Sequence, residues 1–156
     1  MPEPDREYHY QVDRDGRIFH DGAEIIDPAV QRFFLRAMTR TDDGRSLVLC
    51  QGERNWFDAA DTPFVVQRLR LDVSEVGLRG AELCFLGDYR EPLDPRTLET
   101  EHDLLFCRVR GGAFRARFGR VATQQLAPFL VGTAQESALL LGGDRHPVRR
   151  RARTAP

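Results

Sequence analysis

A chain of 156 residues with 41% hydrophobic side chains, including ten Phe, has the size and composition of a folded domain with a sizeable core. The formal net charge is −1 and all 23 basic residues are Arg, which argues against a nucleic-acid-binding protein and excludes lysine-dependent Schiff-base, P-loop and kinase chemistry. The three Cys and four His show no C-x-x-C, H-x-x-x-H or H-E-x-x-H spacing, so no metal site is predicted.

The acidic start of the sequence, 1–5, has the features of neither a secretory signal nor an Arg-rich transit peptide. The longest apolar runs, such as 138–141, are far shorter than the roughly 20 residues that span a bilayer. We therefore expect a cytoplasmic protein with no membrane-spanning segment.

The first half of the sequence reads as a hairpin, a helix and further strands. Asp27 followed by Pro28 is typical of a helix N-cap and first helical residue, and apolar residues at intervals of three and four predict a helix to about Arg40. The strands predicted at 46–50, 55–57 and 64–71 should form an antiparallel meander. The predicted strands are 8–12, 17–20, 46–50, 55–57 and 64–71.

The second half repeats this order approximately. A hairpin around Gly111–Gly112 should lead into a helix from about Arg120 to Leu130. The fold class is therefore α+β, with antiparallel sheets and one main helix in each of two lobes, and the shared order indicates an internal duplication. The predicted strands are 82–86, 104–109, 113–118 and 137–141; the lobes are 8–78 and 79–148, with flexible ends at 1–7 and 149–156.

The densest polar cluster lies between the strands of the first lobe. Glu53 has the chemistry of a general base, Arg54 that of an anion clamp, and Asn55 that of a hydrogen-bond donor and acceptor, with Asp61 close behind. The structural alternative is a surface ion pair followed by a turn. No serine lies in a G-x-S-x-G elbow, so no nucleophile is predicted.

The stretch 8–71 carries the motifs Y-x-Y-x-V-D-x-D-G-R-I-F, C-Q-G-E-R-N-W and D-x-P-F-V-V. With these it resembles the uncharacterised DUF4505 family, also called UPF0598, and more distantly the bacterial DUF1285 family. The resemblance to DUF1285 implies a two-lobed α+β fold whose second lobe is similar to a pleckstrin-homology domain.

The resemblance further implies a ligand site in a cleft between the lobes, for an anionic and nucleotide-like molecule in signal transduction. Carried over to this sequence, the wall of that site is Glu53, Arg54, Asn55 and Asp61 from the first lobe and Arg115, Arg117 and Arg120 from the second. The three second-lobe arginines match no sharp family motif and are included on charge and strand alternation.

Three functions follow as hypotheses. The first is a non-enzymatic module, ligand-binding or regulatory, for a small anion. The second is a protein-interaction module that uses a sheet edge or the Arg-rich end, 149–156. The third is a hydrolase or lyase that uses Glu53 with a histidine such as His102. The sequence names no cofactor and no oligomeric state.

Overall fold

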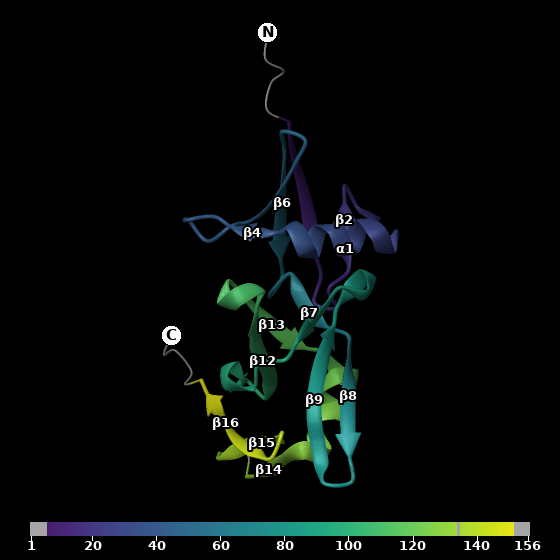
Figure 1. The fold of residues 1–156 in the computed structure, drawn as a ribbon. Helices are drawn as coiled ribbons and strands as arrows, with labels where there is room; N and C mark the ends of the chain where they lie inside the picture. The colour runs from purple at the N-terminus through teal and green to yellow at the C-terminus, as the bar shows by residue number, and fades with distance from the viewer. Residues whose placement is uncertain (1–5, 134, 152–156) are drawn as a thin grey trace. The chain divides into compact units, whose positions relative to one another are not determined.

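The computed structural model describes residues 6–133 and 135–151, so the predictions for 1–5 and 152–156 concern residues outside the described ones. The described residues form mostly strands, with two α-helices and several sheets (Figure 1). The chain divides into two compact units. The first runs to Val65 and also contains Leu86–Tyr89, and the second comprises Val66–Phe85 and the residues from Arg90 onward. The lobe boundary predicted from the sequence lies after residue 78.

The first unit is built on a six-stranded sheet with the order β3-β2-β1-β6-β5-β4. β1 pairs with β6 in parallel and the other pairs are antiparallel. Its elements are β1 (Glu7–Val12), β2 (Ile18–His20), β3 (Ala23–Glu24), α1 (Pro28–Ala37), β4 (Thr39–Arg40), β5 (Ser46–Cys50), β6 (Glu53–Ala59) and the 3-10 turn η1 (Leu86–Asp88).

Helix α1 packs on one face of this sheet. The Asp27 side chain accepts the N–H of Ala29 at 2.9 Å, which confirms the predicted N-cap. The Phe34 ring lies 5.1 Å from Tyr10 and 5.0 Å from Phe57, measured between ring centroids. The helix ends at Ala37, three residues earlier than predicted, because Thr39 and Arg40 pair with β5 as strand β4.

The predicted meander is wrong at its third strand. Both sides of β6 are occupied, one by β5 and the other by β1, so the segment 64–71 cannot join that sheet. It divides instead into β7 (Phe64–Val66) and β8 (Arg68–Ser74). β7 forms one end of a seven-stranded sheet and β8 one end of a three-stranded sheet.

The second unit holds the three-stranded sheet, β10-β9-β8, and most of the seven-stranded sheet, β14-β15-β16-β11-β12-β13-β7. Its further strands are β9 (Gly77–Cys84), β10 (Arg90–Pro92), β11 (Glu99–Glu101), β12 (Leu104–Val109), β13 (Phe114–Phe118), β14 (Leu130–Gly132), β15 (Ser137–Leu141) and β16 (Asp144–Arg150). Its helical segments are α2 (Arg120–Leu126), η2 (Pro95–Thr97), η3 (Arg110–Gly112) and η4 (Ala127–Phe129).

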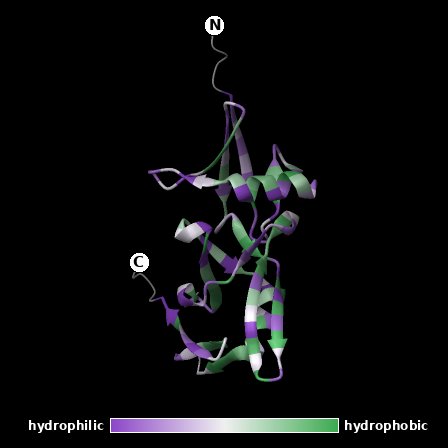
Figure 2. Cartoon of the chain, in the orientation of Figure 1, coloured by the Kyte–Doolittle hydropathy of each residue, from purple (hydrophilic) through white to green (hydrophobic). Residues whose placement is uncertain are grey.

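Hydrophobic and hydrophilic residues alternate along the strands of this unit, so one face of each strand packs into the core. In Figure 2, β8 and β9 alternate between hydrophilic and hydrophobic residues, and Leu69 and Leu83 are buried while Arg70 is exposed. The predicted hairpin around Gly111–Gly112 is β12 with β13. Arg149 and Arg150, which we expected in a flexible end, belong to β16, where they pair with β11. The internal duplication stays a prediction.

The Gln125 side chain on α2 holds the edge strand β8. Its Oε1 accepts the N–H of Leu69 at 2.7 Å and its Nε2 donates to the Leu69 carbonyl at 3.0 Å. We expect Gln125→Ala to lower the free energy of unfolding by about 1–3 kcal/mol, since both partly buried backbone groups lose their partner. Thermal melts test this, with Gln125→Glu as the matched variant, which keeps an acceptor and loses the donor.

Candidate functional site

The predicted site residues of the first unit do not converge on one point. Glu53, Arg54 and Asn55 are consecutive residues of β6, so their side chains alternate between the two faces of the sheet. Arg54 lies 3.4 Å from the Glu7 carboxylate, with both side chains about 45% exposed. Asp61 is exposed in the bend that follows β6. The Glu53 and Asn55 side chains therefore lie apart from the Arg54 guanidinium.

The Asn55 amide has a structural role. The residue is 5% exposed and its Nδ2 donates to the Val48 carbonyl at 3.1 Å, across the pair β5 and β6. Glu53, on the same face, lies close enough to Tyr10 to contribute to its raised pKa, for which burial is the larger cause. The Asn55 amide is therefore used within the sheet.

The described residues of neither unit bring together the side chains that the catalytic alternative requires. Glu53 belongs to the first unit and His102 to the second, so neither unit by itself contains the proposed pair. Cys107 is buried, and this burial raises the pKa of its thiol far above the usual range, which disfavours a thiolate nucleophile.

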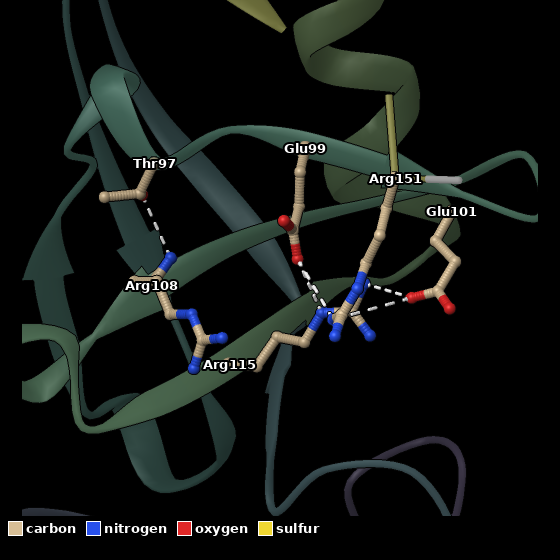
Figure 3. Close-up of polar contacts among 6 residues, drawn as sticks. All are labelled: Thr97, Glu99, Glu101, Arg108, Arg115 and Arg151. Atoms are coloured by element: carbon tan, nitrogen blue, oxygen red, sulfur yellow. Dashed lines mark hydrogen bonds and ion pairs between the residues drawn. The ribbon is translucent and has the colours of Figure 1, made fainter. Parts of the chain in front are cut away.

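Arg115 in the second unit contacts two carboxylates and an aromatic ring. Its Nε lies 2.9 Å from Glu99 Oε1 and its Nη2 lies 2.5 Å from Glu101 Oε2, so the guanidinium bridges two carboxylates of β11. The guanidinium also lies over the Phe106 ring, 3.5 Å from its centroid. Arg151 Nη1 approaches both carboxylates at 3.9 Å. Figure 3 shows the two guanidinium groups lying between Glu99 and Glu101.

Further arginines lie on the same side of the sheet. Arg117 is two residues from Arg115 on β13, Arg108 is directly opposite Arg115 on β12, and Arg149 is opposite Glu99 on β16. We call this surface the arginine face; it consists of Arg108, Arg115, Arg117, Arg149 and Arg151, with Glu99 and Glu101 among them. Five cations and two anions give it a formal excess of three positive charges.

The arginine face contains only part of the predicted set. Arg115 and Arg117 belong to it, whereas Arg120 lies beyond the end of β13 as the first residue of α2. Sequence reasoning missed Arg108 as a site residue and assigned Arg149 and Arg151 to a flexible end. The alternation of Phe106 and Arg108, combined with the register of the Gly111–Gly112 hairpin, could have identified Arg108.

A second charged surface lies on the three-stranded sheet. Glu82 Oε1 lies 3.8 Å from Arg70 Nη1 and 3.7 Å from Arg90 Nη1. Arg70, Asp72, Gly80 and Glu82 surround a shallow depression of about 470 Å³. Because two carboxylates accompany the arginines, this surface has less excess positive charge than the arginine face.

Two solved structures share the fold. A DUF1285 family protein from Silicibacter pomeroyi DSS-3 has a TM-score of 0.70 at 17% sequence identity, with 94% of this chain and 84% of that chain covered. A DUF1285 family protein from Shewanella baltica OS155 has a TM-score of 0.60 at 10% identity, with 76% of this chain and 90% of that chain covered. No family model and no curated protein matches the sequence.

These comparisons support the distant resemblance to DUF1285 at the level of the fold, and they name no activity. The resemblance to DUF4505 stays a prediction. Among the described residues, no helix is long and apolar enough to cross a membrane. The same residues contain no group of three or more His, Cys, Asp or Glu side chains that could hold a metal ion.

Proposed function

We propose that this protein is a non-enzymatic ligand-binding or regulatory module for a small anion, and that the arginine face of the second unit supplies the binding groups. The observation that carries the proposal is the arrangement of Arg115, held by two carboxylates and an aromatic ring, with further arginines beside it. Arginine binds phosphate and carboxylate through two parallel N–H groups.

The preorganised position of the Arg115 guanidinium supports this proposal. A free arginine side chain loses rotamer freedom when it binds an anion, at a cost of roughly 0.5–1.5 kcal/mol. The Arg115 guanidinium is already fixed by Glu99, Glu101 and Phe106, and its side chain is only 19% exposed. Together with Arg151 it balances the charges of Glu99 and Glu101, so the excess positive charge of the face comes from Arg108, Arg117 and Arg149.

The accessible donor is Arg108. This residue is exposed, and its backbone N–H bonds Thr97 Oγ1 at 3.0 Å, which fixes the start of its side chain. No ion pair of its guanidinium is recorded within residues 6–133 and 135–151. Because Arg108 is opposite Arg115 on the next strand, an anion bound at Arg108 lies in the field of both cations.

The binding test uses thermal shift and calorimetry with inorganic phosphate, pyrophosphate, nucleoside triphosphates and dicarboxylates as probes. We expect at least one anion class to raise Tm, since saturating ligand stabilises the folded state. Arg108→Ala should weaken binding of that class about tenfold or more, given roughly 1.5–3 kcal/mol for a hydrogen bond to a charged group.

Arg79→Ala is the matched control, because Arg79 is exposed on β9 of the same unit and lies outside the arginine face. Its affinity for the probe should equal that of the unchanged protein. Equal losses in the two variants would indicate general charge attraction and contradict the proposal. So would the absence of a thermal shift with every anion class at low ionic strength.

A further inference from the structure

The outer edge of β8 is a row of backbone groups that is only partly occupied. β8 is the end strand of the three-stranded sheet, so only one of its sides is paired. On the other side, the N–H and C=O of Leu69 are both bonded by Gln125. Outward-pointing groups recur at every second residue of an edge strand, so those of Leu71 point the same way.

The hydrogen bonds of the neighbouring strand β9 agree with an outward orientation of the Leu71 backbone groups. Ala81, the partner of Leu71 on β9, uses its carbonyl on the far side, where it accepts the N–H of Leu93 at 2.9 Å. Within residues 6–133 and 135–151, no hydrogen bond is recorded for the backbone of Leu71 on its outer side. An exposed pair of strand donor and acceptor groups is complementary to another extended chain.

The side chains around Leu71 indicate which extended chain would pair with this edge. Arg70 and Asp72 flank it and point to the same face of the sheet, where both are exposed. In an antiparallel pair of two identical strands centred on Leu71, Arg70 of each strand lies opposite Asp72 of the other. The sequence Arg70–Leu71–Asp72 is therefore complementary in charge to itself.

We propose that β8 pairs with β8 of a second copy of this chain, antiparallel, about a two-fold axis at Leu71. The two Leu71 residues form a hydrogen-bonded pair and exchange both N–H···O=C bonds. The Arg70–Asp72 positions are then non-hydrogen-bonded pairs, in which opposite side chains approach most closely. Two ion pairs and two backbone hydrogen bonds hold the centre of the interface.

The existing contacts of these side chains are compatible with the pairing. Arg70 is 57% exposed and touches Glu82 only at 3.8 Å, so its guanidinium can lie between Glu82 and Asp72 of the second copy. Asp72 is opposite Gly80 on β9, so no side chain occupies the space across from it.

Gln125 limits the length of this ladder. The next hydrogen-bonded pair would join Leu69 to Val73 of the second copy, but the Leu69 backbone groups are already bonded. The interface is therefore short, and we expect association that depends strongly on protein concentration. The surface is separate from the arginine face, so this inference does not depend on the anion proposal.

The test is sedimentation velocity of the full chain from about 10 µM to about 1 mM. We expect a monomer–dimer equilibrium that Arg70→Asp or Asp72→Arg each weakens at least about tenfold, because like charges then face each other at both pairs. An equimolar mixture of the two variants should recover the dimer, since one strand is then wholly acidic and the other wholly basic at these positions.

Arg79→Asp is the control, an equal change of charge on an exposed residue of the neighbouring strand, and it should leave the equilibrium unchanged. Far-UV circular dichroism checks that each variant is folded. A monomer at every concentration would overturn the proposal. A dimer that survives both single changes, or variants whose mixture stays monomeric, would overturn it as well.

Discussion

Replacing Gly87 by alanine should unfold the first unit at a markedly lower temperature. Gly87 lies in η1 with φ of +69°, a backbone conformation that costs alanine roughly 1–2 kcal/mol. A Cβ atom at this position would lie 2.6 Å from both the backbone N of Arg32 and the carbonyl O of Pro28. These atoms belong to the first turns of α1 and cannot move aside independently, so the 86–89 segment must leave the helix.

The expected loss for Gly87→Ala is about 2–5 kcal/mol, the sum of the backbone cost and an overpacking cost of roughly 1–3 kcal/mol. The bond from Arg32 Nε to the Gly87 carbonyl, 3.0 Å long, would be lost with it. Denaturant melts measure the stability, and hydrogen exchange should show faster exchange at the start of α1 and in 86–89.

Gly52→Ala separates the two causes. Gly52 has φ of +79° in the turn between β5 and β6 of the same unit, and a Cβ there would meet nothing within 4 Å. This variant should lose only the backbone term, roughly 1–2 kcal/mol. Equal losses in the two variants would show that the packing of Gly87 against α1 contributes nothing measurable.

Local sequence signals predicted most of the secondary structure because their physical causes are local. Asp27 followed by Pro28 favours the start of a helix, since the Asp27 side chain caps the first turn and Pro28 has its φ already fixed. The Gly111–Gly112 hairpin likewise follows from residues that accept positive φ. Strand alternation placed Arg115 and Arg117 on one side of β13 before any pairing was known.

Long-range pairing was the part that the sequence left open. Nothing near β6 indicates that β1 occupies its free side in parallel, and this pairing is what breaks the predicted meander. Nothing in the run of arginines after His146 indicates that β16 pairs with β11, which places Arg149 opposite Glu99. The arginine face is assembled from four strands, so its membership depends on register as much as on residue type.

Glu53 and Arg54 are predicted to lie between two strands, but both belong with Asn55 to β6, where strand alternation separates their side chains. A cluster in sequence becomes a cluster in space only on a loop or on one helical face, whereas successive strand residues point in opposite directions. Glu99 and Glu101, two residues apart, meet one arginine for the same reason. Spacing by two along a strand was the better signal for a polar site in this fold.

Removing that arginine should destabilise the second unit most strongly at neutral pH. Arg115→Ala leaves Glu99 and Glu101 close together with Arg151 at 3.9 Å as their remaining recorded cation, and it uncovers the Phe106 ring. We expect Tm to fall by several degrees at pH 7, because two partly buried carboxylates lose their charged hydrogen bonds.

The pH dependence of this effect distinguishes charge from packing. In the unchanged protein, the hydrogen bond from Arg115 lowers the pKa of Glu101 below its ordinary value of 4.5, so the stability it provides is present above that pH and is lost as pH falls through the lowered value. In Arg115→Ala the two carboxylates repel, the pKa of Glu101 is no longer lowered by the arginine, and protonation relieves the repulsion as pH falls. The difference in Tm between the two proteins should therefore shrink from pH 7 to pH 4.

Adding Glu99→Gln and Glu101→Gln to Arg115→Ala removes the unpaired charges while keeping the side-chain volumes. This triple variant should regain much of the lost Tm at pH 7 and show little change in Tm between pH 7 and pH 4. A loss of Tm that stays constant with pH, or that the glutamines do not relieve, would mean that Arg115 acts by covering Phe106. Its carboxylate contacts would then contribute nothing to the preorganisation on which anion binding by the arginine face depends.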